Sequence, residues 1–160
     1  SNRWKGRKPG NYEWYEIQDA IDYYEEFEKP KIIYAEIATR GQFTLDEDNN
    51  YLDTTGFIMG SASKALLGIL NSKVWTFLFS TISSEIRGGY FRWKRQYLES
   101  MPLPQSFEGD NKQIESLVDQ ILTAKREDPD ADTCALEAEI DRLVYELYGL
   151  SEEEIAIVEG

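Results

Sequence analysis

Residues 29–45 are Lys-Pro-Lys-Ile-Ile-Tyr-Ala-Glu-Ile-Ala-Thr-Arg-Gly-Gln-Phe-Thr-Leu, and this stretch decides the first part of the fold. β-Branched and aromatic residues, which favour strands, dominate Lys31 to Ala38, so the pattern predicts a strand buried on at least one face. Pro30 disfavours a helical conformation in the residue before it, so an amphipathic helix predicted over residues 11–28 ends before this strand. Gln42 to Leu45 is predicted to form a second short strand.

Turn and helix signals follow in the next third of the chain. Residues 46–50 are Asp-Glu-Asp-Asn-Asn, which indicates a polar turn, and residues 51–60 are predicted to hold one or two further strands. Apolar side chains at three- and four-residue spacing predict a single helix that starts at Ser61 or Ser63 and runs to about Phe79.

A change from irregular to helical structure is predicted after that helix. Residues 81–100 are expected to be irregular or hairpin-like. Two prolines make residues 101–104 extended, because proline fixes the backbone dihedral and removes a donor. Residues 105–110 are expected to be a linker.

The remainder of the chain is predicted to be helical. Apolar stripes at residues 114–122 and 136–147 flank an Asp-Pro-Asp turn, so two antiparallel helices are expected, with a short capped helix from Ser151. We therefore expect an α+β fold: a small mixed sheet with packed helices over residues 3–106, then an antiparallel helical hairpin and short terminal helix over residues 107–160.

The charge of the chain is concentrated at one end. The formal net charge is −13, and residues 107–160 hold 16 acids and 4 bases, whereas residues 1–106 hold 14 acids and 13 bases. Phosphate contacts need local positive potential, because charges are screened over roughly 8 Å at physiological salt. Distant acidic helices therefore leave DNA binding by the first part possible, but they oppose strong autonomous affinity.

Composition excludes several classes of catalysis. The chain has no histidine and one cysteine, Cys134, which excludes histidine-ligated zinc, histidine-dependent triads and an internal disulfide, and fits a reducing cytoplasm. The Pro-Pro-aromatic and glycine-rich loops of methyltransferases are absent. Asp110-Asn111-Lys112 matches a nuclease-like pattern, but a helix cap explains it better. We expect no catalytic residue, no metal site and no cofactor site, and no membrane span, since the longest apolar stretch is too short.

The basic and aromatic run at residues 85–97 is the best candidate for nucleic-acid contact. Arginine can bind guanine bidentately or clamp phosphate, glycines allow close backbone approach, and Tyr90, Phe91 and Trp93 could wedge or stack. The alternative is a solvated hairpin whose aromatic side chains fill the core. The candidate DNA-binding residues in this run are Arg87, Tyr90, Arg92, Lys94 and Arg95.

Three residues outside this run complete the candidate DNA-binding set. Arg40 and Gln42 follow the strongest strand, where loops carry contacts, and their side chains can bind guanine and adenine edges. Lys64, near a helix start, is a candidate phosphate contact. The alternative for the Arg40–Gln42 loop is an ordinary turn without DNA contact. The charges of the acidic helices either form a solvated face or dock a basic partner surface.

Six stretches of the sequence have the order and spacing of motifs in one known family: residues 28–37, 42–46, 66–73, 87–90, 97–104 and 140–155. Together they are similar to the C-terminal specificity (target-recognition) domain of Taq-type adenine methyltransferases. The same domain occurs in single-chain type II enzymes that both cleave and methylate. The similarity covers about residues 12–104 and 112–160, and Ala35 departs from the proline usual in the strand motif.

The resemblance implies a division of labour within a cytoplasmic restriction–modification enzyme. An upstream domain, absent here, would bind S-adenosylmethionine and methylate an adenine flipped from the duplex, and a Mg-dependent nuclease could precede it. This chain would recognise double-stranded DNA and pack against that upstream domain, with no cofactor of its own. The alternative is a non-catalytic protein–protein interaction module that uses the acidic C-terminal helices.

Overall fold

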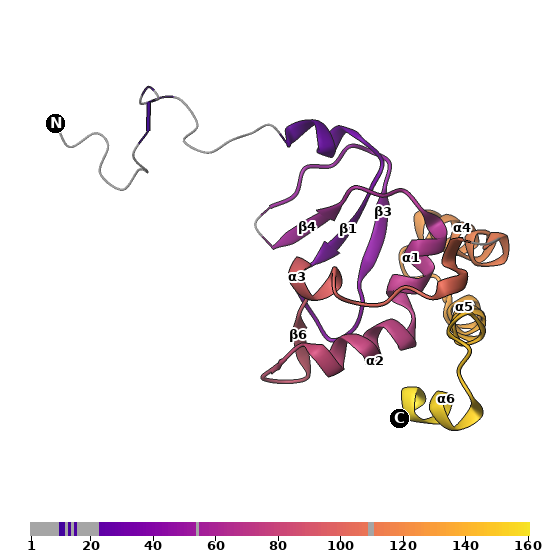
Figure 1. The fold of residues 1–160 in the computed structure, drawn as a ribbon. Coiled ribbons are helices and arrows are strands. Elements are labelled where there is room, and N and C mark those ends of the chain that lie inside the picture. The colour runs from indigo at the N-terminus through magenta and orange to yellow at the C-terminus, as the bar shows by residue number, and fades with distance from the viewer. Residues whose placement is uncertain (1–9, 12, 14, 16–22, 54, 109–110) are drawn as a thin grey trace.

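The computed structural model describes residues 10, 11, 13, 15, 23–53, 55–108 and 111–160 (Figure 1). The α+β class is confirmed: small antiparallel sheets lie beside packed helices. Half of the residues in the helix predicted over residues 11–28 lie outside the described residues. Of the other half, only the 3₁₀ helix η2 (Tyr24–Glu28) is helical. Pro30 follows that turn, and the chain is extended from Lys31 onward, as the sequence predicts.

The predicted strand over residues 31–38 serves two sheets. Its first half, β1 (Lys31–Ala35), lies between β3 (Phe43–Asp46) and β4 (Gly56–Met59), and both pairings are antiparallel. Its second half, β2 (Ile37–Ala38), pairs with another hairpin. All pairings among the described strands are antiparallel, whereas a mixed sheet was expected. Of the one or two strands expected in residues 51–60, one forms, β4.

Glu36 is the residue at which the strand passes from one sheet to the other. Its backbone N–H donates to the carbonyl of Thr55 at 3.0 Å, on the side of the first sheet. Its carbonyl accepts from the backbone N–H of Trp93 at 2.7 Å, on the side of the second sheet. The backbone of a single residue thus ties the two sheets together.

The prediction of one continuous helix up to Phe79 is wrong. Two helices form, α1 (Lys64–Asn71) and α2 (Lys73–Ile82), and their axes meet at 62°. Ser72 between them is extended, with φ −70° and ψ 160°, and its hydroxyl accepts from the Trp75 N–H at 3.2 Å as the cap of α2. Asp141 accepts from the Lys73 N–H at 2.8 Å, so side chains satisfy the donors that the break exposes.

Membrane-spanning length is not reached by any one helix of the described chain. Only α1 and α2 taken together have the required length and composition, and they are bent sharply against each other.

The C-terminal helices pack onto the rest of the chain. α4 (Lys112–Glu127) and α5 (Cys134–Tyr148) form the expected helical hairpin, and α6 (Glu152–Glu159) begins at the expected Ser151 capping box. Gly68 allows α1 to approach α4, because a Cβ there would lie 2.5 Å from Cγ2 of Ile114. Buried residues of α4 and α5 join those of the sheets in one hydrophobic cluster. The domain boundary expected at residues 106–107 stays a prediction. Within the linker expected over residues 105–110, Gln105–Glu108 form the 3₁₀ helix η3.

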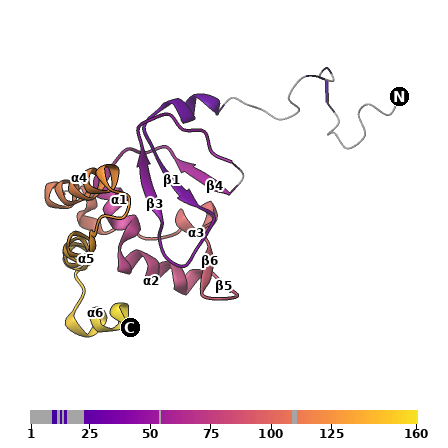
Figure 2. The ribbon, with the colours of Figure 1, turned by 180° about the vertical axis from the view of Figure 1, so that it is seen from behind.

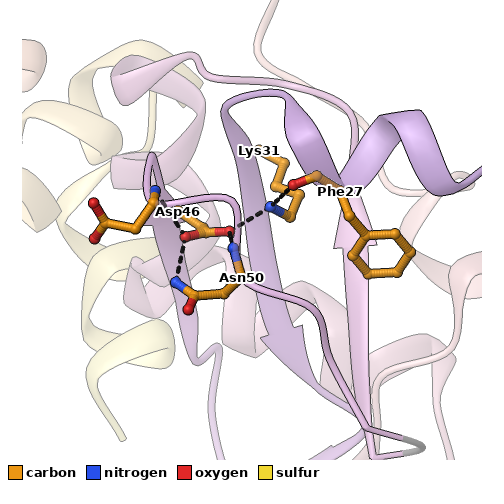
Figure 3. Close-up of polar contacts among 5 residues, drawn as sticks. Phe27, Lys31, Asp46 and Asn50 are labelled. Carbon is orange, nitrogen blue, oxygen red and sulfur yellow. Dashed lines mark hydrogen bonds and ion pairs between the residues drawn. The ribbon is translucent and has the colours of Figure 1, made fainter.

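A buried ion pair fixes the start of β1 against the end of β3 (Figure 3). Lys31 is fully buried, contacts the Asp46 carboxylate, and donates to the carbonyl of Phe27 at 2.7 Å. The same carboxylate accepts from the N–H groups of Asp48 at 3.1 Å and Asn50 at 3.0 Å, and from the Asn50 side-chain amide at 2.7 Å. Burial acts to raise the pKa of Asp46, but the bonds from Lys31, Asn50 and Asp48 together hold it below its usual value.

Replacing Lys31 with methionine should lower the free energy of unfolding at pH 7 by about 3–5 kcal/mol, because the Asp46 carboxylate would stay buried without its cation. The double variant Lys31→Met/Asp46→Leu should recover much of this loss. Ionised Asp46 stabilises the fold above its unfolded pKa of about 4, and this stabilisation disappears as the pH falls through the lower folded value. Urea denaturation from pH 7 to pH 2 checks both points. The difference in the free energy of unfolding between wild type and Lys31→Met should become smaller in acid. A loss below about 1 kcal/mol at pH 7 would contradict this role.

Candidate nucleic-acid interface

The basic and aromatic run forms a tight hairpin, as the sequence predicts. β5 (Glu85–Ile86) and β6 (Tyr90–Arg92) pair antiparallel, and β6 also pairs with β2. Gly88 and Gly89 take φ values of +92° and +79°, a region that side-chain-bearing residues rarely adopt. Glu85 accepts from the Gly89 N–H at 3.0 Å, which closes the turn.

Trp93 anchors the strand that leaves this hairpin. The side chain is 1% exposed, and its ring stacks on Phe79 with centroids 3.9 Å apart and planes 12° apart. Phe43 meets the same ring edge-on at 5.7 Å, and the indole N–H donates to the carbonyl of Ala38 at 3.2 Å. The expectation that Trp93 could wedge into or stack on DNA is therefore wrong, because the residue belongs to the core.

The orientation of Trp93 sets the orientation of its neighbours, because side chains alternate along a strand. Phe91 turns inward and meets Phe79 edge-on, whereas Tyr90, 46% exposed, and Arg92 face solvent. α3 (Arg95–Leu98) follows directly, and Figures 1 and 2 show the hairpin and α3 on the side of the sheets away from α4 to α6. Five of the predicted residues are exposed together on this hairpin and at the start of α3, and we call them the hairpin set: Arg87, Tyr90, Arg92, Lys94 and Arg95.

Two of the four cations in the hairpin set are already paired with carboxylates. Arg92 lies 3.6 Å from the Glu36 carboxylate, and Arg95 lies 2.6 Å from that of Glu99. The hydrogen bond to Glu99 raises the pKa of Arg95 further above its usual range. Arg87 and Lys94 form no ion pair within the part of the chain that the structure describes. Surface pairs of this kind contribute less than about 1 kcal/mol, so phosphate groups can displace the carboxylates.

Arg40 and Gln42 lie in the loop between β2 and β3, and the residue between them fastens that loop to the helices. Gly41 is buried; a Cβ there would lie 2.4 Å from the Leu70 carbonyl oxygen, and its N–H donates to the Thr76 hydroxyl at 3.2 Å. Both neighbouring side chains are exposed and line a groove of about 800 Å³ that α1, α2, α4, α5 and α6 also border. The structure therefore places them beside the C-terminal helices as well as after β2.

Lys64 is not brought to the hairpin set. It is the first residue of α1, and its ammonium group lies 2.5 Å from the carboxylate of Asp119 on α4. The hydrogen bond to Asp119 raises the pKa of Lys64 above its usual value. The charge of Lys64 is thus compensated on the face where α1 meets α4, and the hairpin lies on the other side of the sheets.

Metal-binding geometry is not found in the described part of the chain, where no group of three or more His, Cys, Asp or Glu side chains converges. Of the nuclease-like match, Asp110 lies outside the described residues. Asn111 is the residue before α4, and its side chain donates to the Phe107 carbonyl at 2.7 Å without capping the helix.

Sequence reasoning missed two features of this surface. Ile37 is 47% exposed and pairs with Arg92 across the strands, so an apolar side chain lies beside the cation. Glu36 and Glu99 compete for the arginines. The four-residue spacing of Arg95 and Glu99 could have predicted their ion pair from the sequence. The contact of Arg92 with Glu36 could not be predicted in this way, because it depends on the pairing of β2 with β6.

Replacing Trp93 or Tyr90 with alanine separates a core role from a surface role. Trp93→Ala should lower the free energy of unfolding by about 3–5 kcal/mol, because it removes the stack on Phe79 and the indole hydrogen bond to the Ala38 carbonyl. Tyr90→Ala, on the exposed face, should change it by less than about 1 kcal/mol. Urea denaturation of both variants measures this; equal effects would contradict the assigned orientation.

A known protein family matches the part of the chain that includes the hairpin set. No curated protein sequence matches the chain. A family model described as the TaqI-like C-terminal specificity domain matches residues 2–103, which is more than half of the chain and includes the hairpin set. The chain therefore belongs to the TaqI-like C-terminal specificity domain family.

Proposed function

We propose that this chain recognises a specific sequence of double-stranded DNA on behalf of a restriction–modification enzyme. The methyl transfer to adenine N6 would take place on a separate domain upstream, which binds S-adenosylmethionine and receives the flipped base. A nuclease domain with bound Mg would be a further upstream part. This chain itself would carry no catalytic group, and the enzyme would act in the cytoplasm without a membrane contact.

The hairpin set is the observation that carries the proposal. Arginine, lysine and tyrosine side chains extend from a short hairpin whose buried face is held by Trp93, so they project from a rigid support. A hairpin is narrow enough to enter the major groove of DNA, and the turn at Gly88 and Gly89 allows the backbone to approach phosphates. The family membership supports the same reading.

Positioning and discrimination would be separate tasks on this surface. Lys94 and Arg95, at the start of α3, would contact phosphates and fix the register of the duplex. Arg87 and Tyr90, at the hairpin, would lie closest to the base edges, where an arginine fork pairs bidentately with guanine. Arg40 and Gln42 line the groove beside the C-terminal helices, so a DNA contact from them would be separate from that of the hairpin set.

The carboxylates beside the arginines would make binding depend on salt and on target. Glu36 and Glu99 must release Arg92 and Arg95 when phosphate binds, which weakens contact with any duplex that does not also supply base contacts.

The rival function, a protein-interaction module based on the acidic helices, is favoured by the local charge of residues 107–160 alone. Part of the apolar faces of these helices is already occupied by the core of this chain.

Removing one phosphate-contacting cation should reduce the salt dependence of DNA binding by the amount expected for one phosphate contact. Lys94→Ala and Arg95→Ala should each reduce the slope of log affinity against log salt by about 0.9 and weaken binding at low salt. Fluorescence anisotropy with a duplex that contains the enzyme's target, over a salt series, measures both quantities.

Two matched variants control this experiment. Arg142→Ala on α5 removes an exposed arginine paired with Glu139 and Glu146, and it should leave the slope unchanged. Glu99→Gln frees Arg95 and should tighten binding by about two- to fivefold, since it removes a surface competitor. An unchanged slope in both Lys94→Ala and Arg95→Ala would remove the start of α3 from the DNA site.

A further inference from the structure

The 3₁₀ helix η2 lies at the end of the first sheet that is opposite to the hairpin of β5 and β6 (Figures 1 and 2), and it carries part of an exposed aromatic surface. Phe27 of η2 stacks on Tyr51 of the loop after β3, with centroids 5.1 Å apart and planes 15° apart. Tyr23 leans against Phe27 at 6.1 Å. Tyr23 is 60% exposed and Tyr51 62%, so two of the three rings offer wide faces to solvent. We call these residues the aromatic platform.

The buried ion pair holds the aromatic platform in place. Lys31 donates to the carbonyl of Phe27, and its ammonium group lies 5.9 Å from the centroid of the Phe27 ring. Its partner Asp46 accepts from Asn50, the residue immediately before Tyr51 (Figure 3). One buried lysine therefore connects both chain segments that supply the stacked rings, and the stack is preorganised before any partner arrives.

Carboxylates surround the aromatic platform. η2 contains three glutamates and no base, and the Tyr24 and Tyr51 hydroxyls lie 3.5 Å and 3.4 Å from the carboxylates of Glu25 and Glu28. Burial and the nearby Glu28 charge raise the pKa of Tyr51, so its ring stays neutral at physiological pH. Lys29 is nearby, but its ammonium group is paired with Glu26 at 2.6 Å.

Exposed ring faces with carboxylates at their edges favour one kind of partner. Phosphates are repelled by the negative charge, whereas a guanidinium or ammonium group gains both from the ring quadrupole and from the carboxylates. Arginine fits better than lysine, because its planar group stacks on tyrosine while its edge binds a carboxylate.

From this charge complementarity we propose that the aromatic platform is a docking site for an arginine-bearing protein surface. The site would be occupied at the same time as the hairpin set, since the two lie at opposite ends of the sheets. The inference does not depend on DNA recognition. It assigns a binding role to residues that the proposed function leaves unused.

The probe for this proposal is a short peptide, acetyl-Gly-Arg-Gly-Arg-Gly-amide, titrated into the whole chain labelled with ¹⁵N. Saturable chemical-shift changes should be confined to residues 23–28 and Tyr51 and their neighbours. A peptide with citrulline in place of arginine keeps the shape and removes the charge, and it should bind at least about fivefold more weakly.

Variants at the two ends of the molecule give matched controls. Tyr51→Ser and Tyr23→Ser remove exposed rings and should each weaken peptide binding by about threefold, and Glu28→Gln should act in the same direction. Tyr90→Ser, an exposed tyrosine of the hairpin set, and Glu153→Gln, an exposed acid of α6, should leave it unchanged.

Three outcomes would overturn the proposal. The first is equal binding of the citrulline peptide. The second is a set of shifts spread over α4 to α6 as strongly as over the aromatic platform, which would indicate general attraction to acidic helices. The third is a shift of residues 23–28 and Tyr51 on addition of duplex DNA alone, which would make the surface part of a nucleic-acid site.

Discussion

Trp93 is packed between Phe79 of α2 and Phe43 of β3, and the direction of every side chain on the hairpin follows from that contact. The ring is large and fully buried, and its N–H is satisfied by the Ala38 carbonyl, so the strand cannot rotate about its axis without losing both packing and a hydrogen bond. Tyr90 and Arg92 consequently face solvent. The short second sheet, with two or three residues per strand, depends on this anchor more than on its own ladder.

The same strand carries the other fixed point of the molecule. Lys31 opens β1, and Ala38, which accepts the Trp93 bond, closes β2, so residues 31–38 connect the aromatic platform to the hairpin set. A buried ion pair contributes little net stability compared with apolar packing, because desolvation opposes the attraction. Here it places a loop and a 3₁₀ helix relative to each other, which supports a role in geometry.

Sequence patterns predict this fold where one local preference dominates. The strand over residues 31–38, the glycine turn of the hairpin and the capping box at Ser151 each have a strong local cause, and each is found. The break at Ser72 is not visible in the apolar spacing, because the same spacing continues through it. Asp141, 69 residues away, caps the second helix there. Lys64 and Trp93 show the same limit, since a distant helix neutralises one and a distant ring buries the other.

Photo-cross-linking from one position in the hairpin set and from one position on α4 tests the account most directly. A benzophenone attached to a single cysteine at Lys94→Cys, with Cys134→Ser to remove the native thiol, should cross-link to duplex DNA in a salt-sensitive manner. The same label at Arg126→Cys, an exposed cation at the end of α4, should give little product. Retained DNA binding with equal cross-linking from both positions, or with product only from position 126, would contradict the claim that the duplex lies against the hairpin held by Trp93.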